Sequence, residues 1–468
     1  MKTPSRLLAC LAGVANAVLA GQAAAGAATP EPREIPVPFI AAPLGRLPGP
    51  AELPSRPEMP DVLQRSDGTR VTSPADWPAR RQEILRTLEY YAVGQAPPAP
   101  GNVRGQELAR LALRDGAVTY RRVRLSFGPG GKLGLEIGIF TPAGNGPFPA
   151  VISPSGTPPG ATPLPRLPNG PTQGKGTNVL FVVGGGEPPA PGAPAARGVR
   201  LDPETIAATN PALARGYAYV VFNYNDCGED TTLREADGSW SFRRTRFFPA
   251  YPGYDWGLLR AWAWGVSRIV DHLVTDPVID RAALIITGVS RTGKSAMVAA
   301  AFDDRLALGA PAVTGGGGVG AYRFAGPRRS ETLDVMLTKY PNWFSPRLHP
   351  FRGQRERLPF DQHWFLAACA PRAFLALEGD ADVISLPEAV RQSIAGARPA
   401  FALLGATDRL GVHYAPHGHT FNDDDWAALL DFADWHLRAK PPTRRFDHFP
   451  SEAELDAALQ RPAGPTRR

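Results

Sequence analysis

The chain has 468 residues, of which 43% are hydrophobic and 20% charged, a composition that supports a large core and excludes a chain disordered throughout. Its length suits one elaborated α/β domain with extensions. The formal net charge is +7, but the basic residues are scattered, which argues against nucleic acid as a partner and is compatible with an acidic polysaccharide or with solubility alone.

The first residues have the pattern of a secretory signal peptide. A basic start precedes an apolar run over residues 7–20, and small residues follow it, so we expect cleavage near residues 25–28 and a secreted or periplasmic protein. The apolar run is too short for a membrane span and no later run approaches that length, so no stable membrane insertion is expected. We interpret Cys227 and Cys369 as two separate buried thiols.

The chain divides into four parts. Residues 1–28 are predicted to be a signal peptide, and residues 29–70, rich in proline and without periodicity, are interpreted as a linker or a surface arm. Residues 71–445 are predicted to form the catalytic domain, and residues 446–468 a C-terminal tail. No internal repeat is found.

Within the domain, short apolar or alternating runs predict strands and amphipathic runs predict helices. Strands are expected over residues 118–127, 134–140, 149–153, 218–222, 282–287 and 372–377, and helices over residues 76–91, 256–273, 295–302 and 426–437. Their alternation predicts an α/β three-layer sandwich with a mostly parallel central sheet. Residues 156–200 form a Pro/Gly-rich insertion, and we interpret its Gly184-Gly185-Gly186 as a loop because no helix follows at the right spacing.

The most informative motif is G-V-S-R-T-G-K at residues 288–294, between a predicted strand and a predicted helix. A serine between two glycines on a sharp strand-to-helix turn is the nucleophile elbow typical of α/β hydrolases. Gly288 and Gly293 leave room for the turn, because a Cβ at either position would strike the neighbouring strand or helix. The turn points the Ser290 hydroxyl toward the free N–H groups of the helix. A tight turn with a capping serine is the alternative.

A serine nucleophile needs a histidine base, and the histidine needs a carboxylate to fix its tautomer. In α/β hydrolases these follow in the order Ser, acid, His. His419 lies in a glycine-containing loop before the last predicted helix, so we expect it to be the base, with His417 as the fallback. Asp382 follows the strand at residues 372–377 in a G-x-x-D pattern and is the expected acid, with Asp380 as the near competitor.

Two basic residues, Arg291 and Lys294, follow Ser290 closely in the sequence. The backbone N–H of Arg291 occupies the position that donates to the oxyanion in this fold, and its guanidinium adds a charged donor there. Lys294 lies one helical turn after Ser290 and is expected to meet an anionic or hydroxyl-rich substrate. A lysine on the helix surface is the alternative interpretation.

The S-R-x-G-K elbow resembles the signature of the glucuronoyl esterases, carbohydrate esterase family 15. The resemblance extends over roughly residues 75–440. It includes Y-Y-A-V-G at residues 90–94, the tryptophan-rich residues 256–265, L-P-F-D-Q-H at residues 358–363, and residues 425–436.

The resemblance implies a carboxylic ester hydrolase that cleaves esters between 4-O-methyl-glucuronic acid on xylan and lignin alcohols, with no metal and no organic cofactor. It implies a covalent glucuronoyl intermediate on Ser290, with His419 as base and then acid and the Arg291 side chain helping to hold the oxyanion. Lys294 would contact sugar hydroxyls, and Glu331 matches a polar substrate-binding position of the family. A monomer acting on glucuronoxylan or a lignin–carbohydrate ester is expected.

Two positions depart from the family pattern. Many members place a catalytic Glu after the strand that follows the elbow, where this chain has Val313, so it resembles the bacterial members with a later acid, which supports Asp382. Ile384 stands where many members carry a sugar-stacking Trp. Two alternatives therefore stay open: another carbohydrate esterase such as an acetyl xylan esterase, and a carbohydrate-binding protein with impaired catalysis.

Overall fold

The computed structural model describes residues 44–162, 179–182, 202–234, 240–242, 244–324 and 331–461. The expected signal peptide and the loop at Gly184-Gly185-Gly186 lie outside these residues. None of the helices in the described part is both long and apolar enough to cross a membrane.

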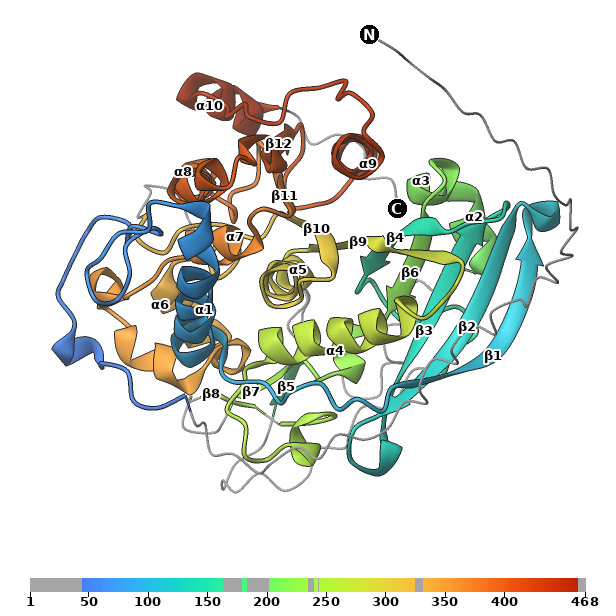
Figure 1. Cartoon of the computed structure of the whole chain (residues 1–468), viewed down its shortest axis with the longest axis horizontal. Helices are drawn as coiled ribbons and strands as arrows, with labels where there is room; N and C mark the ends of the chain where they lie inside the picture. The colour runs from blue at the N-terminus through green and yellow to red at the C-terminus, as the bar shows by residue number, and fades with distance from the viewer. Residues whose placement is uncertain are drawn as a thin grey trace, which may run out of the picture. The chain divides into compact units, whose positions relative to one another are not determined.

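The described strands form two sheets (Figure 1). The larger has nine strands in the order β1-β2-β3-β6-β4-β9-β10-β11-β12. Strands β1 to β3 are antiparallel and β3 is antiparallel to β6, whereas β6, β4, β9, β10, β11 and β12 are parallel. Strands β5, β7 and β8 form a separate antiparallel sheet. The strand bounds are β1 Arg104–Leu113, β2 Val118–Phe127, β3 Leu133–Pro142, β4 Phe148–Ser153, β5 Val179–Val182, β6 Ala218–Phe222, β7 Thr231–Arg234, β8 Trp240–Phe242, β9 Ile279–Val289, β10 Leu306–Ala312, β11 Ala373–Gly379 and β12 Leu410–Ala415.

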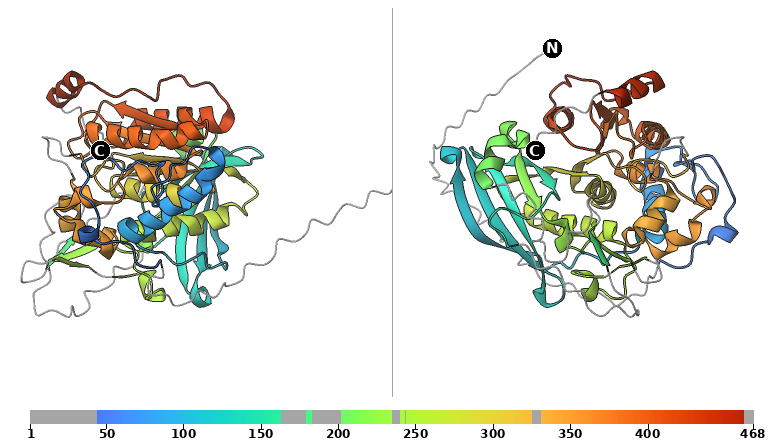
Figure 2. Two further views of the ribbon diagram at one scale, coloured as in Figure 1. Left: turned by 60° about the vertical axis from the view of Figure 1, so that its left-hand side comes forward. Right: turned by 180° about the vertical axis from the view of Figure 1, so that it is seen from behind.

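Helices cover both faces of the larger sheet (Figure 2). Buried side chains fall into two groups: one holds residues of α1, α4, α5, α7 and α8, and the other holds residues of α2, α3 and α9. The α/β three-layer sandwich is thereby confirmed. The helix bounds are α1 Trp77–Thr87, α2 Pro203–Thr209, α3 Pro211–Ala214, α4 Leu258–Leu273, α5 Arg291–Phe302, α6 Leu333–Lys339, α7 His363–Cys369, α8 Pro387–Leu403, α9 Asp423–Arg438 and α10 Glu452–Gln460.

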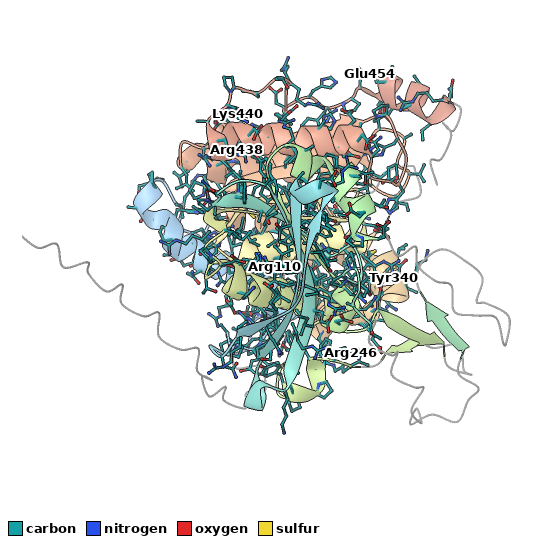
Figure 3. All side chains as sticks on the ribbon, turned by 90° about the vertical axis from the view of Figure 1, so that its right-hand side faces the viewer. Arg110, Arg246, Tyr340, Arg438, Lys440 and Glu454 are labelled. Carbon is teal, nitrogen blue, oxygen red and sulfur yellow. The ribbon has the colours of Figure 1, made fainter. Side chains whose placement is uncertain are left out.

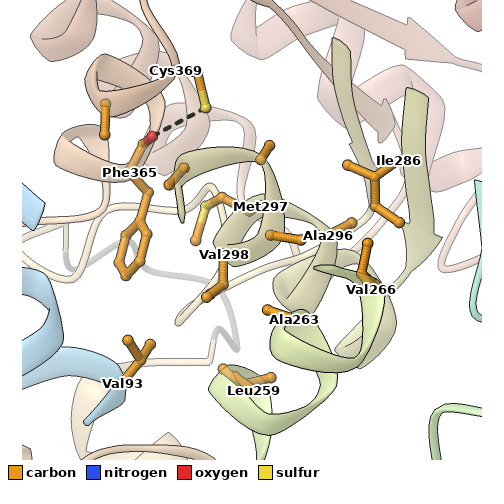
Figure 4. Close-up of a cluster of buried hydrophobic side chains, with 14 of the residues drawn as sticks. Val93, Leu259, Ala263, Val266, Ile286, Ala296, Met297, Val298, Phe365 and Cys369 are labelled. Atoms are coloured by element: carbon orange, nitrogen blue, oxygen red, sulfur yellow. Dashed lines mark hydrogen bonds between the residues drawn. The ribbon is translucent and has the colours of Figure 1, made fainter. Parts of the chain in front are cut away.

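Figure 4 shows a part of the core in which residues of α4 and α5 lie in one buried cluster with Ile286 of β9 and Phe365 of α7. Ala296 and Met297 of α5 are at most 1% exposed and belong to the same buried group as Ala263 of α4. The small residues of α5 let the two helices approach closely, which fixes the start of α5 on the sheet. Cys227 and Cys369 are both free and buried, as expected. The Cys369 Sγ donates to the backbone oxygen of Phe365.

Described residues on both sides of the predicted domain also make defined contacts. In the described part of the proline-rich arm, Val62 is 1% exposed, and the Pro48 oxygen accepts from Tyr91 Oη at 2.6 Å. The arm therefore packs on the domain through apolar side chains and backbone oxygens. Helix α10 lies within residues 446–468, and a capping box formed by Ser451 and Glu454 satisfies the free N–H groups at its start.

Candidate active site

Ser290 occupies a strained turn between β9 and α5. Its φ of 56° and ψ of −118° lie in a region that L-residues rarely adopt. Its N–H donates to the Ala312 oxygen at 2.9 Å, which ties the turn to β10. A Cβ on Gly288 would lie 2.6 Å from the Thr292 oxygen, and one on Gly293 2.8 Å from the Gly288 oxygen. Both glycines are thus required sterically, as the sequence predicts.

Parallel pairing brings the loops after β9, β11 and β12 to one edge of the sheet. Ala312 of β10 pairs with Val289 on one side and with Leu377 on the other. The loop after β11 is hydrogen-bonded to the loop after β12, because Asp380 N–H donates to the Ala415 oxygen and Ala381 N–H to the His417 oxygen, each at 3.0 Å. The loops that carry Ser290, Asp382 and His419 therefore lie at the same edge of the sheet, at the carboxyl ends of its parallel strands.

Asp382 and His419 form a close pair. His419 Nδ1 lies 2.8 Å from Asp382 Oδ2, and the Asp382 side chain is fully buried while that of His419 is 30% exposed. The other oxygen, Oδ1, accepts from the Ile384 N–H at 2.8 Å. The carboxylate can hold the imidazole in the tautomer with a proton on Nδ1, which leaves Nε2 to accept one. Asp380 instead pairs with Arg461, so the geometry favours Asp382.

His417, the fallback base, is engaged elsewhere. Its Nε2 lies 2.8 Å from Asp425 Oδ2, and its Nδ1 lies 2.7 Å from the Gly418 oxygen. Burial opposes protonation, but the bond to Asp425 prevails and raises the pKa of His417. Asp425 also belongs to the capping box of α9. His417 therefore links the histidine loop to the helix that follows it.

Arg291 is held by a buried carboxylate. Its Nη1 donates to Asp230 Oδ2 at 2.6 Å, and Asp230 Oδ1 accepts from Trp343 Nε1 at 2.8 Å. Burial raises the pKa of Asp230, although Arg291 and Trp343 act in the opposite direction. The guanidinium lies 5.6 Å from the Trp343 ring centre. Sequence reasoning missed Asp230 and Trp343, since neither stands in a recognisable motif.

Lys294 is buried and not a surface lysine. Its side chain is 1% exposed, and its Nζ donates to Glu331 Oε2 at 2.7 Å and to the Thr314 oxygen. Glu331 is 18% exposed, so this carboxylate reaches solvent while the lysine beneath it does not. Gly315 has a φ of 58°, and a Cβ there would lie 2.7 Å from Glu331 Oε2, so this position favours glycine.

The position expected for a family Glu is part of the core. Val313 is fully buried with a φ of 43°, and its N–H donates to the Leu377 oxygen at 2.8 Å. An apolar side chain at this position has no group that could orient a histidine. This agrees with a carboxylate supplied by the loop after β11.

A second buried carboxyl, Glu378, lies at the end of β11, just before the loop that carries Asp382, and the sequence analysis did not single it out. It is fully buried at the end of β11, and its Oε2 accepts from Ser385 Oγ at 2.5 Å. Burial, reinforced by Asp382 and Asp425, raises the pKa of Glu378 well above its usual value. Its neighbour Gly379 allows the histidine loop to pack against the strand end, since a Cβ there would collide with the His417 oxygen. The sequence signal that could have pointed to Glu378 is an acidic residue near the end of the otherwise apolar strand β11.

Comparisons with known proteins point to one family. A family model described as "Glucuronyl esterase, fungi" matches residues 197–405. A 4-O-methyl-glucuronoyl methylesterase from Podospora anserina is 29% identical over 76% of this chain and 62% of its own length, so the chain spans less than two thirds of that relative. A protein of the same name from Neurospora crassa is 27% identical over 81% of this chain and 82% of its own length.

Solved structures agree with these relatives. A family 15 glucuronoyl esterase from Caldicellulosiruptor kristjansonii has a TM-score of 0.63 and 28% identity, covering 85% of this chain and 96% of that one. A promiscuous esterase of the same family from a marine bacterial metagenome has a TM-score of 0.65 and 25% identity, covering 83% and 98%.

The fold and the strained serine turn define an α/β hydrolase with a serine elbow. Over most of its length the chain is also similar to named glucuronoyl esterases and to solved structures of carbohydrate esterase family 15.

Proposed function

We propose that the protein is a serine esterase that hydrolyses esters of glucuronic acid or 4-O-methyl-glucuronic acid, as in lignin–glucuronoxylan cross-links. The observation that carries the proposal is the strained Ser290 elbow at the same sheet edge as the Asp382–His419 pair, whose atoms lie 2.8 Å apart. The names of the relatives from Podospora anserina and Neurospora crassa support this substrate class.

The proposed reaction has two steps. Ser290 Oγ attacks the ester carbonyl while His419 Nε2 takes its proton, and the buried carboxylate of Asp382 stabilises the resulting imidazolium. His419 then protonates the departing alcohol, which leaves a glucuronoyl ester on Ser290. Water, activated by the same imidazole, hydrolyses that ester and releases glucuronate.

Arg291 supplies positive charge where the carbonyl oxygen becomes negative. Arg291 is the first residue of α5, where its backbone N–H is free to donate to the oxyanion. Asp230 holds the Arg291 guanidinium in a fixed orientation, so little reorganisation is needed when the oxyanion forms. Charge held in place before the reaction is the usual source of transition-state stabilisation in such sites.

Glu331 is the substrate-binding group, and Lys294 orients it. The carboxylate is partly exposed, and its ion pair with the buried Lys294 holds it in one orientation. An ionised carboxylate accepts hydrogen bonds from sugar hydroxyls, which a simple acetyl ester would not provide. This favours a uronate ester over an acetyl ester. Lys294 acts on the sugar through Glu331 in this proposal.

The test compares benzyl glucuronate with benzyl acetate, with Ser290→Ala as control. We expect a higher kcat/KM for the glucuronate and loss of both activities in the variant. Preference for the acetate would replace the substrate with that of an acetyl esterase. Absence of hydrolysis of either ester by folded protein would favour a carbohydrate-binding protein.

We also infer that the protein acts outside the cytoplasm as a monomer. The signal-peptide pattern over residues 1–28 supports the location. Expression in a bacterial host, followed by N-terminal mass analysis of the exported protein, should find cleavage near residues 25–28. Light scattering should give the mass of one chain. Retention of Met1 in the soluble protein would contradict the location.

A further inference from the structure

His417, two residues before the proposed base, has a hydrogen-bond acceptor next to each of its ring nitrogens. Its Nδ1 lies 2.7 Å from the Gly418 oxygen, and its Nε2 lies 2.8 Å from Asp425 Oδ2. A carbonyl oxygen only accepts hydrogen bonds, so Nδ1 must carry a proton. A neutral imidazole has no second proton, and its Nε2 lone pair would then face a carboxylate oxygen. Both contacts are favourable only when His417 is an imidazolium ion.

Asp425 depends on this charge. Its side chain is 1% exposed, and among the described residues His417 is the only basic side chain that pairs with it. Its Oδ2 also accepts from the Asn422 N–H at 2.8 Å in the capping box of α9. A buried carboxylate without a charge partner is costly. Burial alone would lower the pKa of His417, but the contact with Asp425 outweighs burial and raises that pKa above its ordinary value of 6.5.

The other titratable groups nearby leave this charge in place. On β11 and the loop after it, the acidic residues are Glu378, Asp380 and Asp382. Asp380 adds to the attraction and is paired with Arg461. Burial, with Asp382 and Asp425 acting in the same direction, raises the pKa of Glu378, so this carboxyl favours its neutral form. On α9, the residue before Asp425 is already paired with two basic side chains: Asp424 with His413 and Arg444.

The His417 ring is packed between the strand end and α9. A Cβ on Gly379 would lie 2.4 Å from the His417 oxygen and 2.7 Å from its Nδ1, so the ring has little room to turn away. The His417 oxygen accepts from the Ala381 N–H at 3.0 Å, next to Asp382. His417 thereby connects the acid loop to the first turn of α9.

Helix α9 is a firm support for this contact. Arg438, its last residue and labelled in Figure 3, donates to the Arg215 and Gly216 oxygens at 2.9 and 2.7 Å. Phe432 of the same helix is fully buried. Because α9 is held at its far end and by its core side chains, a contact from its first turn to His417 fixes the histidine loop relative to the sheet.

We propose that His417 is a positioning residue whose imidazolium ion fixes the loop that carries the proposed base, His419. The Gly418 oxygen is close to His417 Nδ1 and also accepts from the Thr420 N–H at 2.9 Å, so one atom connects the residues on either side of His419. Deprotonation of His417 removes the attraction to Asp425 and loosens this loop. The stabilisation is complete below pH 6.5 and is lost as the pH rises through the raised pKa of His417. The catalytic consequence rests on the proposed function, whereas the charge on His417 does not.

The first arm of the test is an NMR titration, which needs no substrate. Full-length protein with ¹³C-labelled histidines is titrated from pH 5.5 to pH 9.5, and His417 and His419 are assigned from the spectra of His417→Gln and His419→Gln. We expect a midpoint above 6.5 for His417 and a second shift of the His419 signal at that same midpoint. Asp425→Asn keeps an oxygen that accepts from the Asn422 N–H but removes the charge, so the His417 midpoint should fall by about one pH unit or more.

The second arm measures kcat and KM for benzyl glucuronate over the same pH range. As His417 loses its proton, kcat should fall by about tenfold or more, since a small misplacement of a catalytic group is costly. KM should stay within about threefold, because Glu331 rather than the histidine loop binds the sugar in the proposed function. His417→Gln should have a kcat about tenfold lower at pH 6.5 and no such fall above it. The matched control is His413→Gln, which removes a histidine beside Asp424 and should keep the parent profile.

Several outcomes would overturn the proposal. They are a His417 that is neutral at pH 6.5, a kcat profile that His417→Gln leaves unchanged, and an equal change in His413→Gln. If the parent hydrolyses no glucuronate, the substrate assignment fails, and the presence or absence of the coupled His419 shift still decides the proposal. If His417→Gln does not fold, Asp425→Asn decides it, because a spectrum in which no histidine midpoint falls would refute the charge pair.

Discussion

Replacing Asp382 with Asn changes one atom in a fully buried side chain, and the structure predicts a large loss of activity. Oδ1 accepts from the Ile384 N–H, so the amide oxygen of the variant will keep that place and the NH₂ group will face His419 Nδ1. Two donors cannot share that 2.8 Å contact. The imidazole must then carry its proton on Nε2, the tautomer that is unable to accept a proton from Ser290.

An Asp-to-Asn change that reverses the tautomer in this way lowers kcat by about 10⁴-fold in a serine protease, which corresponds to about 5 kcal/mol in the activation free energy. We expect a loss of that order for kcat on benzyl glucuronate. The melting temperature should change little, since the shape and the Ile384 bond are kept. Asp382→Ala should lose activity to a similar extent.

The matched control is Asp380→Asn, two residues away in the same loop. Asp380 pairs with Arg461 rather than with a histidine, so kcat should stay within about threefold of the parent. If Asp382→Asn kept kcat within tenfold, or if Asp380→Asn lost more, the reasoning about the acid would be refuted.

Three further predictions concern the cations and the buried carboxyl. Arg291→Lys should lower kcat at least 100-fold, because a point charge does not reproduce the planar fork that Asp230 holds; unchanged turnover would contradict an oxyanion role. Lys294→Met should destabilise the protein by about 3–5 kcal/mol in chemical unfolding, because it leaves Glu331 without its charge partner, and Lys294→Met with Glu331→Gln should recover much of that loss; full additivity would refute the coupling. The pKa of Glu378 is raised on folding, so its contribution to stability is complete below the usual pKa of 4.5 and declines as pH rises above it. Glu378→Gln should therefore gain stability relative to the parent between pH 4 and pH 8, and a constant difference across that range would show that Glu378 does not titrate as the structure implies.

The features that the sequence predicts best are those encoded by a short, continuous stretch of residues. The elbow is encoded within seven residues, and its glycines are needed for contacts with the same turn and the adjacent strand. The proximity of Asp382 and His419 could be predicted from the order of residues in the fold, because both loops follow strands whose carboxyl ends must meet at one edge. Strands β2 and β6 match their predicted bounds residue for residue, since their patterns are sharply bounded.

What the sequence did not predict depends on contacts between distant segments. Asp230 and Trp343 lie 113 residues apart and meet only in the folded chain. Helical spacing placed Lys294 beside Ser290 but carried no information about Glu331, which covers it. Helix α4 starts at Leu258 rather than at Trp256, because Gly257 is extended and its N–H bonds to the Val93 oxygen. Strand β1 was missed because most of its side chains are exposed.

The most direct test of the central claim is labelling with a serine-reactive phosphonate. The protein is incubated with the reagent in the presence or absence of glucuronate, and its peptides are then analysed by mass spectrometry. The account predicts one phosphonyl group on the peptide that contains Ser290, formed more slowly with glucuronate and unaffected by acetate. Folded protein that stays unlabelled, or that is labelled at another serine, would contradict it.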